Sequence, residues 1–123
     1  MMDKKYNILI VDDSKMARMV LSKTVESLGY NVVAEAIDGL DGCKKYQEHK
    51  PDLIITDIEM PNMNGIEMIE MIKKLNPNVQ VIAVSSVMNK QLTQRILALG
   101  VKHFIVKPIK TEILKNILLN INK

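Results

Sequence analysis

The chain has 123 residues, a length that suits one domain and excludes two full domains. With 47% hydrophobic and 25% charged residues, its composition is that of an ordinary globular protein and excludes a disordered or fibrous one. The net charge of +3 comes from scattered lysines, and no basic block with interleaved aromatic residues is present. We therefore expect no nucleic-acid binding.

No apolar run reaches the roughly 18 residues that a membrane span requires, and the apolar run near the start is too short for a secretory signal. The single cysteine, Cys43, can form neither an internal disulfide nor a cysteine metal cluster, so we interpret it as a small buried hydrophobic residue. These features predict a cytoplasmic protein that does not insert into membranes.

Five short apolar runs alternate with five helix-patterned stretches along the chain. The first run, residues 8–11, is continuously apolar, as is typical of a strand that is buried on both faces, and it ends at Asp12 and Asp13. A helix follows, which Asp13 or Ser14 can cap, and Gly29 is suited to end it in the left-handed conformation.

Residues 31–36 predict a second strand, followed by a short helix that Gly39 and Gly42 weaken. Residues 53–56 predict a third strand that runs directly into Asp57. The loop 58–65 then leads into a third helix.

Residues 79–84 predict the fourth strand, which is followed by Ser85, and residues 103–106 predict the fifth strand, which is followed by Lys107. Each is followed by a further helical pattern. The residues that mark the five expected helices by their spacing are Ala17, Val20, Leu21, Thr24 and Leu28; Leu40, Cys43, Tyr46 and Gln47; Ile66, Ile69, Ile72 and Leu75; Leu92, Ile96 and Leu99; and Ile113, Leu114, Ile117, Leu118 and Ile121.

Strict alternation of strands and helices predicts an α/β fold, because parallel neighbours need crossover helices that cover both faces of the sheet. We expect one domain with a doubly wound, five-stranded parallel sheet of flavodoxin-like order 2-1-3-4-5 and five helices. In such a sheet, ligands bind beyond the carboxyl ends of the strands.

Four strand ends deliver polar groups to that edge: Asp12 and Asp13, Asp57, Ser85, and Lys107. Each residue alone is explained as a helix cap, a turn residue or a solvated charge. Together, three carboxylates repel one another and one lysine cannot neutralise them all, which favours a bound cation. Hard oxygen ligands suit Mg²⁺.

An aspartate can act as a nucleophile and form an acyl phosphate. Asp57 stands alone at the end of the middle strand, so it is the candidate acceptor of a phosphoryl group. Lys107 would bind the phosphoryl oxygens as a point charge, and the Ser85 hydroxyl would donate a hydrogen bond to them.

The chain contains, in this order, the segments ILIVDDS, DLIITDIEMPNMNG, AVSS and FIVKP. With these segments it resembles the receiver domains of two-component response regulators, and the resemblance covers essentially the whole chain, residues 1–123. The resemblance implies that Asp57 accepts phosphate from a phosphohistidine of a sensor histidine kinase. It also implies that Asp12, Asp13, the phosphorylated Asp57 and the main-chain carbonyl of Glu59 bind Mg²⁺.

The same resemblance implies a switch in which Ser85 moves toward the phosphoryl group while Phe104 turns inward, so that the face of the fourth helix, fifth strand and fifth helix changes shape. Lys107 and Pro108 match the family's Lys-Pro step, which is typically cis, and Gly65 matches the loop glycine. Many members have Thr and Tyr at the two switch positions, and Phe104 lacks the phenolic hydroxyl. The Glu59 carboxylate is expected to affect the lifetime of the phosphoryl group.

The stretch from residue 32 to residue 51 is most similar to that of the stand-alone chemotaxis members of the family. This similarity implies a signalling domain, not an enzyme, that catalyses its own phosphorylation and dephosphorylation. Its partners would be the kinase, a downstream protein such as the flagellar motor switch, and a phosphatase.

Three alternatives remain open. A receiver can also be a phosphorelay shuttle or part of a longer transcriptional regulator, although no basic recognition helix is present here. A phosphatase of the haloacid-dehalogenase type also uses an aspartate nucleophile and Mg²⁺, but its paired acids follow a D-x-D pattern, whereas Asp12 and Asp13 are adjacent.

The nine methionines are unusually many for a chain of this size. Met68 and Met71 fall at helical spacing, and we expect most of the other methionines to fill gaps in the core or to lie in loops. Met88, in the loop before the fourth helix, is the candidate for a partner contact.

Overall fold

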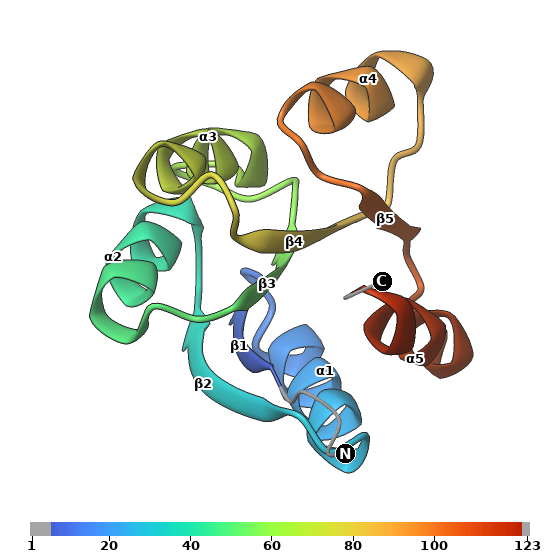
Figure 1. Cartoon of the computed structure of the whole chain (residues 1–123). Coiled ribbons are helices and arrows are strands. Elements are labelled where there is room, and N and C mark those ends of the chain that lie inside the picture. Colours follow the sequence, from blue (N-terminus) through green and yellow to red (C-terminus); the bar gives the residue numbers. More distant parts are fainter. Residues whose placement is uncertain (1–5, 122–123) are drawn as a thin grey trace.

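The computed structural model describes residues 6–121, which form one parallel sheet of five strands covered by five helices (Figure 1). The elements in chain order are β1 (Asn7–Val11), α1 (Lys15–Ser27), β2 (Asn31–Ala36), α2 (Gly39–His49), β3 (Leu53–Asp57), α3 (Gly65–Leu75), β4 (Gln80–Ser85), α4 (Lys90–Ala98), β5 (His103–Val106) and α5 (Thr111–Asn120). The strand order is β2-β1-β3-β4-β5, and all pairs are parallel. The predicted fold class, topology and number of elements are confirmed.

The sheet has a separate apolar core on each face. Helices α1 and α5 cover one face, and α2, α3 and α4 cover the other (Figure 1). Along β1, Leu9 and Val11 pack under α2 to α4, whereas Ile8 and Ile10 pack under α1 and α5. Both faces of the strand are buried, which explains why its sequence is continuously apolar rather than alternating.

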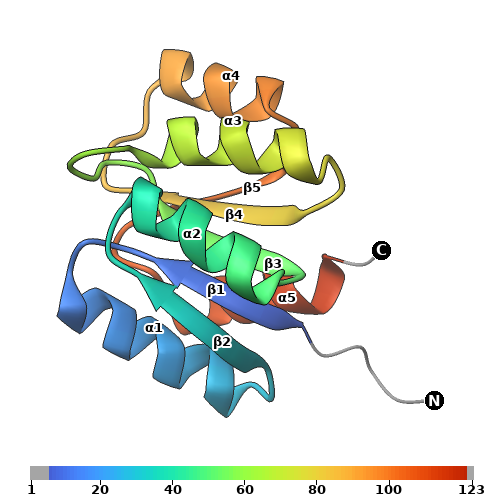
Figure 2. The same ribbon diagram turned by 90° about the vertical axis from the view of Figure 1, so that its left-hand side faces the viewer.

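Side-chain caps determine where four of the helices begin. Ser14, Asp38, Asn64 and Asn89 each accept a hydrogen bond from a backbone N–H in the first turn of α1, α2, α3 and α4, respectively. A capped helix cannot extend backward into the strand, so the residues between strand and helix remain in the connecting loops. These loops gather at the carboxyl ends of the strands, at the left of Figure 2.

Some residues at the edges of the predicted buried helix faces are exposed in the structure. Val20, Leu40, Leu75 and Ile113 are between 46% and 60% exposed. Periodicity locates the buried face of a helix, but its width depends on how far the sheet extends beneath it. The fourth strand likewise runs from Gln80 to Ser85, one residue later than predicted.

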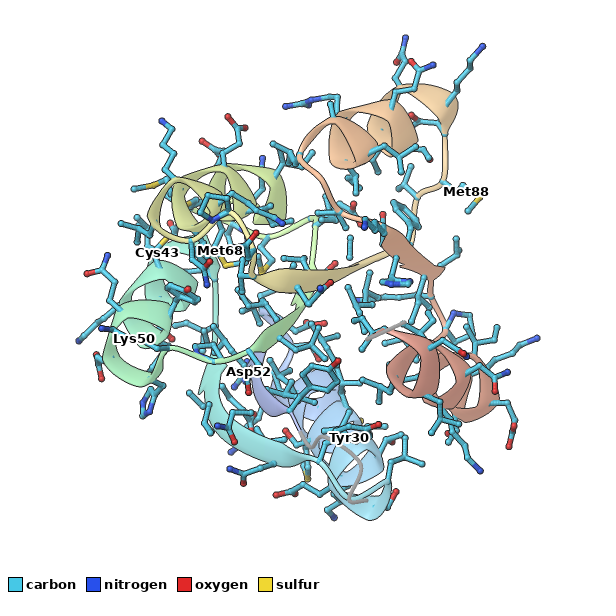
Figure 3. All side chains as sticks on the ribbon, in the orientation of Figure 1. Tyr30, Cys43, Lys50, Asp52, Met68 and Met88 are labelled. Atoms are coloured by element: carbon cyan, nitrogen blue, oxygen red, sulfur yellow. The ribbon has the colours of Figure 1, made fainter. Side chains whose placement is uncertain are left out.

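The expectation for the methionines is wrong for the three exposed methionines of α1 and α3, Met16, Met19 and Met71. Met68 is fully buried and lies beside Cys43 between α2 and α3 (Figure 3). Four other methionines are at least 43% exposed: Met16, Met19, Met71 and Met88. Met88 points away from the body of the protein at the β4–α4 connection (Figure 3). The burial predicted for Cys43 is confirmed.

Within residues 6–121, no helix is both long enough and apolar enough to cross a membrane.

Gly65 begins α3 where the chain folds back tightly over the end of β3. Its N–H donates to the Ile58 carbonyl oxygen at 2.9 Å. A Cβ at this position would collide with the carbonyl oxygen of Asp57 and would lie 2.9 Å from the Cα of Ile58. The loop therefore requires a residue without a side chain, because backbone atoms cannot move aside as a flexible side chain can.

We expect Gly65→Ala to lower the free energy of unfolding by about 1–3 kcal/mol, as overpacking in a tight site does. Urea denaturation monitored by circular dichroism measures this change. Glu70→Ala, at an exposed position of the same helix, is the control and should change stability by less than about 0.5 kcal/mol. Equal stabilities of the two variants would contradict the close approach.

Candidate functional site

Three carboxylates meet at the carboxyl edge of the sheet. Val11 of β1 pairs with Thr56 of β3, so the residues that follow, Asp12 and Asp57, lie side by side. One carboxylate oxygen from each of Asp12, Asp13 and Asp57 can be chosen such that all three lie within 4.8 Å of one another. Asp12 and Asp57 are buried, whereas Asp13 is exposed and leaves the cluster open to solvent.

Lys107 supplies the positive charge of this cluster. Its Nζ donates to Oδ2 of Asp12 at 3.3 Å and to Oδ2 of Asp57 at 3.2 Å. The Lys107 N–H donates to the Ser85 carbonyl oxygen at 2.8 Å, which fixes the backbone of Lys107 to the end of β4. The peptide bond between Lys107 and Pro108 is cis, as the Lys-Pro pattern predicted.

Burial and charge act on the Asp57 carboxylate in opposite directions. Burial raises the pKa of Asp57, the Lys107 hydrogen bond lowers it, the charges of Asp12 and Glu59 raise it further, and the net result is a raised pKa. Burial alone would lower the pKa of Lys107, but its hydrogen bond to Asp57 and the charges of Asp57 and Asp12 raise it overall. The ammonium ion therefore stays protonated between the two carboxylates.

Ser85 lies at the end of β4, fully buried, but its hydroxyl is not hydrogen-bonded to Asp57. It donates to Oε2 of Glu59 at 2.6 Å. Glu59 belongs to the β3–α3 loop and has an exposed side chain. The sequence placed both residues near the site, but it did not indicate that they contact each other.

Phe104 lies on β5, where it pairs with Ala83 of β4. The residue is half-buried and packs against the core beneath α2, α3 and α4. Lys107 follows the end of this strand directly, three positions after Phe104.

Arg18 was missed by the sequence reasoning. Its Nη1 donates to the main-chain oxygen of Asp12 at 2.8 Å, and its Nε lies 3.3 Å from Oε1 of Glu35 on β2. Ser22 donates to the other oxygen of the same glutamate at 3.1 Å. Arg18 thus holds the segment that bears Asp12 against the second strand. The signal in the sequence was Glu35, an acid within an otherwise mostly apolar strand.

The donor set fits a small, hard divalent cation. All three side chains offer carboxylate oxygens, and Mg²⁺ is commonly held by one or two carboxylates together with waters and a phosphate. No histidine or cysteine belongs to this cluster, which disfavours zinc. The exposed Asp13 leaves access for water and for a phosphoryl group.

The raised pKa of Asp57 predicts a dependence of stability on pH in metal-free buffer. Above the pKa of Asp57 in the folded protein, the folded state bears the full cost of a buried charge. Below the ordinary aspartate pKa of 3.8, Asp57 is neutral in both the folded and the unfolded state, and that cost disappears. Asp57→Asn should therefore stabilise the protein at pH 7, with a gain that disappears below pH 3.8. Urea unfolding in EDTA at both pH values measures this gain, and a gain independent of pH would contradict the assignment.

The comparisons with known proteins agree with this geometry. Residues 8–119 match the family model described as "Response regulator receiver domain". The chain is 42% identical to the chemotaxis protein CheY of Thermotoga maritima, over 82% of this chain and 84% of that protein. It is 45% identical to a protein-glutamate methylesterase/protein-glutamine glutaminase of the same organism, over 88% of this chain but only 32% of that protein.

Among solved structures, the chain is similar to one in the crystal structure of the CheX-CheY-BeF₃-Mg²⁺ complex from Borrelia burgdorferi. The TM-score is 0.92 and the sequence identity is 33%, with 96% of this chain and 90% of that chain covered. The resemblance therefore extends from the motifs to the whole backbone. The chain belongs to the response regulator receiver domain family.

Proposed function

We propose that this receiver domain, spanning residues 1–123, accepts a phosphoryl group on Asp57 from the phosphohistidine of a sensor histidine kinase. The observation that carries the proposal is the arrangement of Asp57 beside Asp12 and Asp13, with the Lys107 ammonium ion bound to two of the three carboxylates. A nucleophile, acidic groups for a cation and a fixed positive charge thus lie at one open edge of the sheet.

In the proposed transfer, an oxygen of the Asp57 carboxylate forms a bond to phosphorus while the bond between phosphorus and the imidazole nitrogen of the donor breaks. Lys107 stays charged and neutralises the phosphoryl oxygens from the side of β5. Mg²⁺, held by Asp12, Asp13, Asp57 and the main-chain carbonyl of Glu59, would supply further charge neutralisation. The protein thus positions and neutralises groups, and it catalyses its own phosphorylation and dephosphorylation.

The consequence that we propose is a change of the surface formed by α4, β5 and α5, through Ser85 and Phe104. This surface already presents exposed apolar side chains of Leu97, Val106 and Ile113, which a protein partner can cover. No acidic residue occurs between Glu70 and Glu112, so the two charged residues of α4, Lys90 and Arg95, are both positive. A protein with an acidic and apolar contact surface is complementary to it.

Chemotaxis is the biological context that the CheY relatives support. We propose a cytoplasmic protein whose partners are the kinase, a downstream protein such as a flagellar motor switch component, and a phosphatase. The structure with CheX shows that a relative with this fold is bound by a second protein. The much longer methylesterase relative supports the second candidate, a receiver that is part of a larger regulator or a phosphorelay. The phosphatase of haloacid-dehalogenase type has no support among these relatives.

Incubation with acetyl phosphate and Mg²⁺ should add one phosphoryl group to the protein, and the group should be absent from Asp57→Ala. Intact-mass spectrometry measures the addition. Asp52→Ala is a matched control, because Asp52 precedes β3 at the opposite end of the same strand (Figure 3). A folded protein that binds Mg²⁺ but gains no mass would remove the acceptor role from Asp57.

Mg²⁺ should raise the midpoint of thermal unfolding, because a ligand that binds only the folded state stabilises it. At 100 times the dissociation constant, the gain in unfolding free energy is about 2.7 kcal/mol. Calorimetry with increasing Mg²⁺ tests this, and Asp13→Asn should weaken the response while leaving the metal-free protein folded, because Asp13 is exposed. An equal response of both proteins would place the cation elsewhere.

A further inference from the structure

The side chain of Glu59 joins two loops at the carboxyl edge of the sheet. Its Oε2 accepts the Ser85 hydroxyl at 2.6 Å, and its Oε1 accepts the N–H of Ser86 at 3.3 Å and the Ser86 hydroxyl at 3.4 Å. We call these three residues the Glu59 clasp. The clasp links the β3–α3 loop, which begins just after Asp57, to the β4–α4 loop, which leads into α4.

The clasp occupies the one proton that the Ser85 hydroxyl can donate. The Val87 carbonyl oxygen lies 2.8 Å from the same hydroxyl, and the Val87 N–H donates to it at 3.0 Å. Hydrogen bonds to ionised groups are shorter and stronger than those between neutral groups, so the carboxylate is the preferred acceptor. While this bond exists, Ser85 cannot donate its proton to an oxygen on Asp57.

We propose that Glu59 is a positioning residue that holds Ser85 in its resting orientation, so that a phosphoryl group on Asp57 has to compete with the Glu59 carboxylate for the Ser85 hydroxyl. This inference rests on the proposed function of Asp57. It assigns to the side chain of Glu59 a role separate from that of its main-chain carbonyl.

The charges explain how phosphorylation releases the clasp. A phosphoryl group adds about −1.5 to −2 charges at neutral pH. Glu59 lies close enough to Asp57 for the two carboxylates to interact, so the added charge repels Glu59 and at the same time offers Ser85 a better acceptor. Release frees the loop that holds Met88 and Asn89, and Asn89 caps α4 through the N–H of Leu92.

Beryllofluoride with Mg²⁺ is the probe for the competition, because it mimics a phosphoryl group without turnover. Loss of the clasp should lower the beryllofluoride concentration at half-saturation about tenfold in Glu59→Ala, as expected for a hydrogen bond to a charged group. Protein amide NMR follows the titration. Glu70→Ala removes an exposed carboxylate of α3 that has no hydrogen bond within the described chain, and it should titrate like the wild type.

Two further variants distinguish the effect of losing the hydrogen bond to Ser85 from the effect of losing the negative charge of Glu59. Glu59→Gln removes the same charge but keeps an acceptor for Ser85, so its gain should be smaller than that of Glu59→Ala. In a Ser85→Ala background, removal of Glu59 should give almost no gain, because the bond that it breaks is already absent. Equal gains in Glu59→Gln and Glu59→Ala, or an undiminished gain without Ser85, would overturn the proposal.

A measurement without any phosphoryl mimic tests the clasp independently of the function proposed for Asp57. The Val87 N–H is bonded to the Ser85 hydroxyl, so its hydrogen exchange should accelerate in Glu59→Ala but not in Glu70→Ala. Unchanged exchange would overturn the clasp even in a protein that is phosphorylated normally. Conversely, accelerated exchange in a protein that acetyl phosphate does not modify would support the clasp and reject the proposed function.

Discussion

The attraction of one ammonium ion to two buried carboxylates is the interaction on which the site depends. Parallel pairing forces Asp12 and Asp57 together, because each follows one of two neighbouring residues of β1 and β3. Like charges brought together at a partly buried edge destabilise the fold. Lys107 offsets this repulsion from β5, and its main-chain bond to Ser85 fixes it in place. One ammonium ion reduces the repulsion among the three carboxylates but does not neutralise them all, and the remaining negative charge favours a bound cation.

Much of this edge could be predicted from the sequence, because a parallel sheet brings the carboxyl ends of its strands to one side. Once the continuous apolar runs are identified as strands, the residues that follow them must meet. That reasoning placed Asp12, Asp57 and Lys107 correctly without knowledge of any distance. The glycine at position 65 and the cis bond before Pro108 came from the family resemblance, and the structure gives the physical reason only for Gly65, whose missing side chain leaves room for the backbone of β3.

Contacts between side chains of different loops could not be predicted in this way. Arg18 reaches the main chain of Asp12 and the carboxylate of Glu35, two partners that helical periodicity does not relate to each other. The bond between Glu59 and Ser85 joins positions 26 residues apart and depends on the conformation of both loops. Met16 and Met71 are exposed although we expected them to be buried, for a related reason: the pattern of a helix does not show where the sheet beneath it ends.

The contacts of Lys107 and those of the Glu59 clasp have opposite effects on the proposed response to phosphorylation. Under the proposed function, Lys107 favours a phosphoryl group on Asp57, because its ammonium ion neutralises the phosphoryl oxygens. The Glu59 clasp opposes the rearrangement that follows, because Ser85 has a single proton and a carboxylate already holds it. A binding event at Asp57 can bias a distant surface only by its difference in affinity for two arrangements. Under this proposal, that difference is a choice of acceptor for the Ser85 hydroxyl, between the Glu59 carboxylate at 2.6 Å and a phosphoryl oxygen on Asp57.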